Sequence, residues 1–107
     1  MLTSTTETIA GYKVVETLGL VKGNTIRARH IGNDIIASLR TIIGGEINEY
    51  TKMMAESREQ AYDRLLLDAK MKGADAVIGL KFETSTVLAG AAELLCYGTA
   101  VKLEEIK

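Results

Sequence analysis

Residues 75–84 read DAVIGLKFET and residues 92–103 read AELLCYGTAVKL. Both segments are rich in residues that favour strands, and their apolar residues fall on both alternating sets of positions. In the first segment, one set of positions holds Ala76, Ile78, Leu80 and Phe82, and the other holds Val77 and Gly79. In the second segment, one set holds Leu94, Cys96 and Ala100, and the other holds Leu95, Tyr97, Val101 and Leu103. We therefore predict two strands that are apolar on both faces.

The stretch before these strands has the period of a helix. From Glu46 to Lys72 one face is marked by Ile47, Tyr50, Met54, Ala61, Leu65 and Ala69. Gly73 follows and is typical of the left-handed residue that ends a helix. Such a helix would be roughly 40 Å long, whereas a compact chain of this size has a radius of gyration of about 13 Å. It must span the domain, bend or project from it.

The first part of the chain predicts a hairpin and a shorter helix. Residues 12–21 and 25–28 are β-rich, and Gly23-Asn24 between them is typical of a two-residue turn. Asn33 or Asp34 can cap a short helix, which Gly44-Gly45 would end. Its apolar stripe would consist of Ile35, Ile36, Leu39, Ile42 and Ile43.

These elements predict one α+β domain over residues 1–107, with two layers: an antiparallel sheet, and one short and one long helix. Two helices on one side leave the other apolar side of the sheet bare, although antiparallel sheets normally expose only a polar face. A chain of this length buries only roughly two thirds of the surface that it exposes when unfolded. We therefore expect a second copy of the chain to do so.

Composition excludes several classes of function. Thirteen basic and fourteen acidic residues give a net charge of -1, which disfavours nucleic acid as a partner. No stretch approaches the roughly 18 apolar residues of a membrane span, and residues 1–10 do not resemble a secretion signal. The single cysteine, Cys96, cannot form an internal disulfide. We expect a cytoplasmic protein without a membrane segment.

Several motifs, in their order and spacing, resemble those of the YbjQ-like family of small bacterial and archaeal proteins, which is described as "putative heavy-metal-binding". They are Gly23-Asn24-Thr25, Arg27-Ala28-Arg29, Gly44-Gly45-Glu46-Ile47, Tyr50-Thr51, Arg58-Glu59, Ala61, Arg64, residues 73–77, Gly79, residues 82–85 and residues 97–101. The resemblance covers nearly the whole chain. It implies a dodecin-like subunit assembled into a ring, a pentamer. Cys96 and Asp75 stand where alanine and asparagine are usual in that family.

Metal binding has two candidate ligands, Cys96 and His30, because soft metals prefer thiolate and imidazole. One of each cannot close a site within a subunit, although a ring could bring several copies together. The alternatives are that Cys96 fills the core and that His30 is a solvated loop residue. Binding of a harder cation by Glu46 and Glu49 is a further possibility.

The other candidate ligand-binding residues are Gly44, Gly45, Glu46, Tyr50, Arg58 and Arg64. Free amides at Gly44-Gly45 could bind an anion that Glu46 orients, or Glu46 could simply favour the start of the helix. Arg58 lies on or beside the apolar stripe, which predicts a structural ion pair, with Glu93 as a candidate partner within the subunit or between subunits, or else an anion site. Tyr50 and Tyr97 could stack on a flat ligand, although both fit core positions.

These observations favour a non-catalytic ring that binds a small ligand or a metal ion at its subunit interfaces, the cofactor being unidentified. The first alternative is an enzyme with an interfacial active site formed by Glu46, Tyr50, Arg58 and Arg64, in which burial shifts one carboxylate. The second is a structural ring without a ligand.

Overall fold

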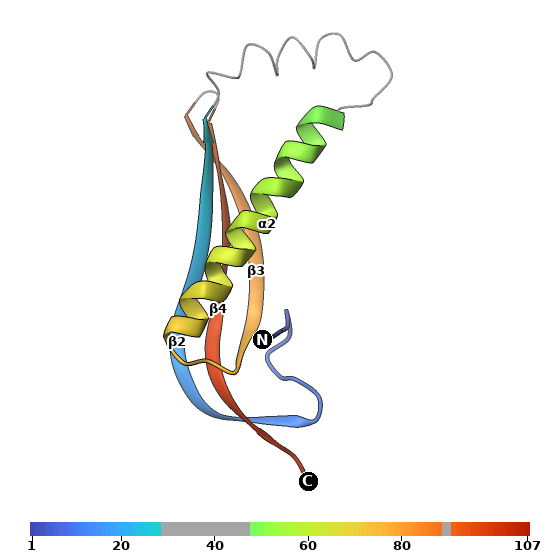
Figure 1. Cartoon of the computed structure of the whole chain (residues 1–107), viewed down its shortest axis with the longest axis vertical. Helices are drawn as coiled ribbons and strands as arrows, with labels where there is room; N and C mark the ends of the chain where they lie inside the picture. Colours follow the sequence, from blue (N-terminus) through green and yellow to red (C-terminus); the bar gives the residue numbers. More distant parts are fainter. Residues whose placement is uncertain (29–47, 89–90) are drawn as a thin grey trace.

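A computed structural model describes residues 1–28, 48–88 and 91–107. Its elements are β1 (Leu2–Thr3), β2 (Tyr12–Ala28), α2 (Asn48–Met71), β3 (Ala76–Leu88) and β4 (Ala91–Glu105), as Figure 1 shows. The short helix expected between Asn33 and Gly44 lies outside the described residues. The two strands and the long helix predicted in the second half of the chain are confirmed.

The strands form one sheet in the order β1-β3-β4-β2. β4 lies in the middle and pairs antiparallel with both β2 and β3. β1 pairs parallel with β3, with Leu2 opposite Ala76 and Thr3 opposite Val77. The prediction of a wholly antiparallel sheet is therefore wrong at one edge, because a strand of two residues is too short to show an alternating pattern.

The predicted hairpin at Gly23-Asn24 is also wrong. β2 is one continuous strand of 17 residues, in which Gly23 lies opposite Cys96 and Asn24 opposite Leu95. Gly23 is needed because α2 passes directly over it. A Cβ atom on Gly23 would overlap the Ala61 carbonyl oxygen and the Leu65 nitrogen of α2. The glycine allows a close approach of two backbones and makes no turn.

α2 runs obliquely along the sheet for about 36 Å (Figure 1). Its buried positions recur every four residues, at Ser57, Ala61, Leu65 and Ala69. Ala61, Leu65 and Ala69 pack on side chains of β2, β3 and β4 that include Val21, Val77, Leu80, Cys96 and Ala100. The apolar stripe predicted from Ala61, Leu65 and Ala69 is thus the core face of the helix.

The predicted end of the long helix is confirmed. Gly73 has a φ of 75°. The Gly73 amide donates to the Lys70 carbonyl at 3.0 Å, and the Ala74 amide donates to the Ala69 carbonyl at 3.1 Å. These two bonds define a Schellman cap, which satisfies carbonyls at the end of the helix.

A bulge in β3 changes which side chains share a face of the sheet. Ile78 lies opposite Thr99 and Lys81 opposite Tyr97, so β3 has one residue more than β4 in this interval. Gly79 starts the bulge with a φ of 61°, the conformation of a G1 bulge. Strict alternation, which placed Phe82 on the face of Ile78, is therefore wrong beyond Gly79.

Beyond the bulge Phe82 lies on the side of α2. Its ring stacks against that of Tyr62 in α2, with centroids 6.4 Å apart, and 44% of the residue remains exposed. Lys81 and Glu83 turn to the opposite face. The bulge thus moves an aromatic side chain towards the helix and two charged side chains away from it.

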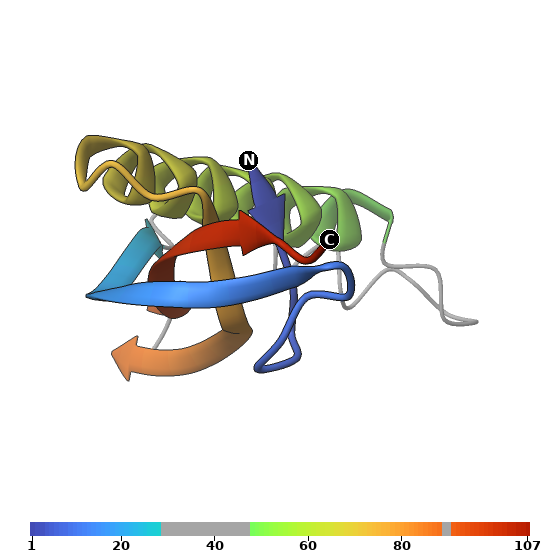
Figure 2. The ribbon, with the colours of Figure 1, turned by 90° about the horizontal axis from the view of Figure 1, so that it is seen from below.

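α2 covers only one face of the sheet, as Figure 2 shows, and within the described ranges no other helix covers the second face. The molecule is elongated, with extents of 57 × 25 × 16 Å and a radius of gyration of 17.5 Å. A compact chain of this length has a radius of about 13 Å. The fold therefore leaves much of the sheet outside its own core.

The contact at Gly23 gives the first prediction. Gly23→Ala places a methyl group against the backbone of α2, so the helix must shift, and we expect the free energy of unfolding to fall by at least about 2 kcal/mol. Urea denaturation measures this. Lys13→Ala, at an exposed position of the same strand, is the control and should change stability by less than about 0.5 kcal/mol. Equal stability of the two variants would contradict the close contact.

Candidate functional site

The sheet face turned away from α2, here called the open face, carries the described polar side chains that are best placed for binding. The pairing of β2, β4 and β3 arranges them in rows across three strands. The rows are Leu20, Thr99 and Ile78; Lys22, Tyr97 and Lys81; Asn24, Leu95 and Glu83; and Ile26, Glu93 and Ser85. The open face therefore combines exposed aliphatic side chains at its edge with charged groups around one tyrosine.

The second of these rows, here called the lysine row, consists of Lys22, Tyr97 and Lys81. Direct neighbours in such a row have Cβ atoms about 5 Å apart. The Tyr97 hydroxyl donates a hydrogen bond to Glu83 Oε1 at 3.0 Å. This bond raises the pKa of Tyr97 above its usual value, because the negative charge of Glu83 favours the protonated phenol. Tyr97 is thus a neutral donor with a fixed partner.

Arg64 and Glu93 contact the same residue of β2. An Arg64 guanidinium nitrogen donates to the Asn24 carbonyl oxygen at 2.5 Å, and Asn24 Nδ2 donates to Glu93 Oε2 at 3.0 Å. Arg64 therefore binds the backbone at the edge of the sheet. The pair predicted between Arg58 and Glu93 is not formed within the subunit as described, because Arg58 is exposed and Glu93 accepts from Asn24.

Asp68 makes the second link between α2 and the edge strand. Its Oδ2 accepts a hydrogen bond from the Lys22 backbone amide at 3.1 Å, and its Oδ1 pairs with Lys72 Nζ at 2.8 Å. The hydrogen bond from Lys72, followed by that from Lys22, lowers the pKa of Asp68. With Arg64, this contact occupies outward-facing backbone groups of β2, a common protection for an edge strand.

Cys96 points to the core and away from the open face. It is 0% exposed and packs with Val21, Ala61 and Leu65. Burial raises the pKa of its thiol to about 11, because an apolar environment disfavours thiolate. In the part of the chain that the structure describes, no three His, Cys, Asp or Glu side chains are grouped to hold a metal ion. These facts favour the core-filling alternative for Cys96.

Most of the other predicted site residues cannot be placed. His30, Gly44, Gly45 and Glu46 lie outside the described residues, and of Tyr50 only the backbone, in α2, is described. Of the predicted ligand-binding set, Arg58 and Arg64 remain, and both are exposed residues of α2. The predicted anion site at Gly44-Gly45 therefore stays a prediction.

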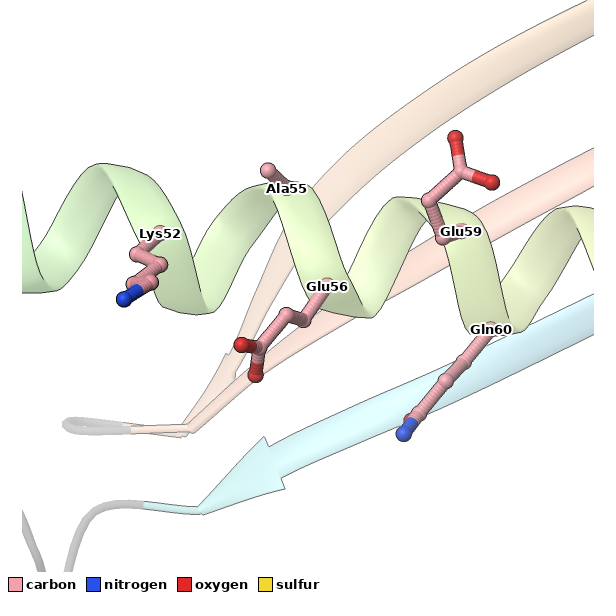
Figure 3. A pocket seen from close by; sticks show the side chains of 5 residues that line it. All are labelled: Lys52, Ala55, Glu56, Glu59 and Gln60. Atoms are coloured by element: carbon pink, nitrogen blue, oxygen red, sulfur yellow. The ribbon is translucent and has the colours of Figure 1, made fainter.

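A shallow hollow of about 470 Å³ lies on the outer surface of α2, lined by Lys52, Ala55, Glu56, Glu59 and Gln60. In Figure 3, Glu56 and Gln60 project from one side of the helix, whereas Glu59 points away from them. Glu56 and Glu59 do not converge on one point, so the hollow lacks the arrangement of a two-carboxylate site. Sequence analysis did not identify this hollow.

The lysine row was also missed. In the sequence, Lys81 and Glu83 look like the polar interruptions of an ordinary strand, and nothing relates them to Lys22, which is 59 residues away from Lys81. The one local signal is Gly79, because a glycine inside a strand often marks a bulge. Without the pairing register, that signal does not show which side chains the bulge brings together.

The fold and the open face define a small α+β domain with a four-stranded sheet, a helix on one side and a second side that no described helix covers. The family described as "putative heavy-metal-binding" matches residues 1–104. The chain belongs to this YbjQ-like family, as its motifs predicted. Within the described ranges, no helix is both long and apolar enough to cross a membrane.

Relatives agree with this assignment, and a solved structure has a similar fold. The chain is 60% identical over 105 residues to a UPF0145 protein of Methanococcus vannielii, with 98% of this chain and 100% of that protein covered. It is 52% identical to a UPF0145 protein of Thermus thermophilus, with 97% and 91% covered. A protein of unknown function from Pediococcus pentosaceus has a similar fold, with a TM-score of 0.61, 20% identity, and 97% and 98% coverage.

The burial of Cys96 gives the second prediction. With a pKa of about 11, only about one thiol in a thousand is ionised at pH 8, and the folded core shields the sulfur from reagents. Iodoacetamide should leave the native protein unlabelled and add one label after unfolding in guanidinium chloride, as measured by mass spectrometry. Cys96→Ala should take up no label in either state. Rapid labelling of the native protein would contradict the described core.

The bond between Tyr97 and Glu83 gives the third prediction. Because the folded pKa of Tyr97 is raised, its contribution to stability is fully present below pH 10 and is lost as pH rises through the folded pKa. The Tyr97 titration is the difference between the phenolate absorbance of the wild type and that of Tyr97→Phe. Glu83→Gln should move its midpoint down towards 10, whereas Glu104→Gln should not. An unchanged midpoint in Glu83→Gln would argue against the bond.

Proposed function

We propose that this protein is the subunit of a cytoplasmic homo-oligomer, a pentameric ring, which binds a small ligand or a metal ion at its subunit interfaces without catalysis. The observation that carries the proposal is the open face, because α2 covers only the other side of the sheet. In the oligomer, a second copy covers the open face. The ring arrangement and the number of five subunits are taken from the family resemblance.

The size of the exposed surface supports a second copy. The chain has an accessible surface of 7301 Å², whereas a compact monomer of 11.6 kDa has about 5,800 Å². The excess is about 1,500 Å². A standard protein interface buries about 800 Å² per partner, so the excess is of the size that two such interfaces per subunit would remove. A subunit in a ring has two interfaces.

Apart from the two lysines of the lysine row, the chemistry of the open face also suits burial. Leu20 is 63% exposed and Ile26 59% exposed, at the edge strand. Tyr97 is already hydrogen-bonded to Glu83, and Asn24 to Glu93, so covering these groups does not leave them without partners. Exposed aliphatic side chains beside satisfied polar groups are typical of protein interfaces.

What one described subunit provides supports an interfacial position for the ligand. Burial disfavours thiolate at Cys96, and among the described residues no three His, Cys, Asp or Glu side chains are grouped to hold a metal ion. In the proposed ring, a metal site would draw on residues from more than one copy, with His30 as the remaining candidate ligand. A small ligand held by the open face would be enclosed only when the second copy is in place.

The fourth prediction tests the assembly. Native mass spectrometry and light scattering should give an oligomer, and the mass should reveal a retained ligand or metal. The variant Leu20→Lys with Ile26→Lys changes two side chains that are exposed in the single chain, so it should keep its circular dichroism spectrum but dissociate. Ile106→Lys, equally exposed near the C-terminus, is the control and should remain assembled.

Two outcomes would overturn parts of the proposal. If the wild-type protein is monomeric at micromolar concentration, the proposed oligomer is wrong. An oligomer that retains no ligand or metal, and that binds none added in titration, would instead support a structural ring.

A further inference from the structure

The lysine row places two ammonium groups around one tyrosine on the open face. Lys22 and Lys81 both lie directly opposite Tyr97, one from each neighbouring strand. Their Cα atoms are two strand spacings apart, about 10 Å. Lysine side chains are long and flexible, so both ammonium groups can converge above the Tyr97 ring. Lys81 takes this position only because of the bulge at Gly79, which turns it to the open face.

The positive charges of the lysine row outnumber the carboxylates near it. In the described part of the chain, the ammonium groups of Lys22 and Lys81 form no ion pair. Glu83, in the next row, accepts the Tyr97 hydroxyl. Asp68 of α2 also interacts electrostatically with Lys22, but Asp68 already forms an ion pair with Lys72 Nζ at 2.8 Å. Two lysines and one nearby glutamate leave a positive charge in the row.

The remaining acid of the open face is too distant to neutralise that charge. Glu93 lies four residues along β4 from Tyr97, which is about 13 Å in a strand, and it accepts a hydrogen bond from Asn24. A second copy that presented the same face would bring carboxylates that are already hydrogen-bonded. In the single chain, water solvates the two ammonium groups, but a cover over the open face displaces this water. Covering an unpaired ammonium group is costly.

We propose that the lysine row binds a small oxyanion, a ligand that carries a phosphate or carboxylate group, between the open face and the copy that covers it. This inference rests on the proposed function for the cover and adds the chemical class of the ligand. The oxyanion accepts hydrogen bonds from the ammonium groups of Lys22 and Lys81 and supplies the missing negative charge. The Tyr97 ring, fixed by Glu83, forms the floor of the site.

The fifth prediction uses inorganic phosphate and succinate as probes, each titrated into the full-length protein by calorimetry. We expect at least one of them to bind the wild type. Lys22→Gln and Lys81→Gln should each weaken that binding about tenfold or more, because each variant removes one charge-assisted hydrogen bond. Lys70→Gln removes the same charge from an exposed position in the last turn of α2 and should change the Kd by less than about twofold.

Light scattering on the same samples separates this inference from the proposed function. An oligomer that binds neither anion, or that binds them equally well in all three variants, would overturn the anion site and leave the oligomer standing. Weaker assembly of Lys22→Gln and Lys81→Gln without anion binding would show that a partner copy neutralises the lysines, and would also overturn the site. Lysine-dependent binding by a single chain would support the row as an anion site and overturn the oligomer.

Discussion

The close approach of α2 to β2 is the contact on which the rest of the fold depends. It is possible because small residues meet there: Gly23 lies under Ala61, and the Thr25 hydroxyl donates to the Ser57 carbonyl at 3.2 Å. Backbones that lie this close fix the height and direction of the helix over the sheet. Arg64 and Asp68 then reach the outer edge of β2. The same contact commits α2 to one face, so α2 cannot cover the other face of the sheet.

A second constraint, the bulge at Gly79, sets the chemistry of the uncovered face. Without the extra residue, Phe82 would lie on the open face, and Lys81 and Glu83 would lie under α2. With it, the aromatic ring stacks on Tyr62 and the two charged side chains join Tyr97. One glycine in a left-handed conformation thus moves an apolar group towards the core and polar groups towards the surface. The electrostatic character of the open face follows from a backbone irregularity more than from composition.

The sequence predicted those features whose causes are local. The period of α2, the glycine cap at Gly73 and the alternation around Cys96 and Tyr97 each depend on neighbours within a few residues, and the structure confirms them. The errors have non-local causes. Gly23 resembles a turn residue until α2 is placed above it, and the lysine row exists only through the register of three strands. Of the candidate site, the sequence offered Tyr97 only as a residue that could stack on a flat ligand but that fits a core position, and it missed the two lysines beside Tyr97.

Cys96 and Tyr97 are neighbours in β4 but lie on opposite faces of the sheet, one in the core and the other on the open face. Cys96 faces α2, where burial keeps its thiol protonated, and its exposure would require α2 to leave the sheet and uncover Val21 and Leu65. Coordination of a soft metal through Cys96 would therefore compete with the folding of the domain itself. Tyr97, one residue along, lies on a face that can bind a ligand without disturbing that core. Chemistry compatible with a stable fold is consequently to be sought on the Tyr97 side of the sheet, which α2 does not cover.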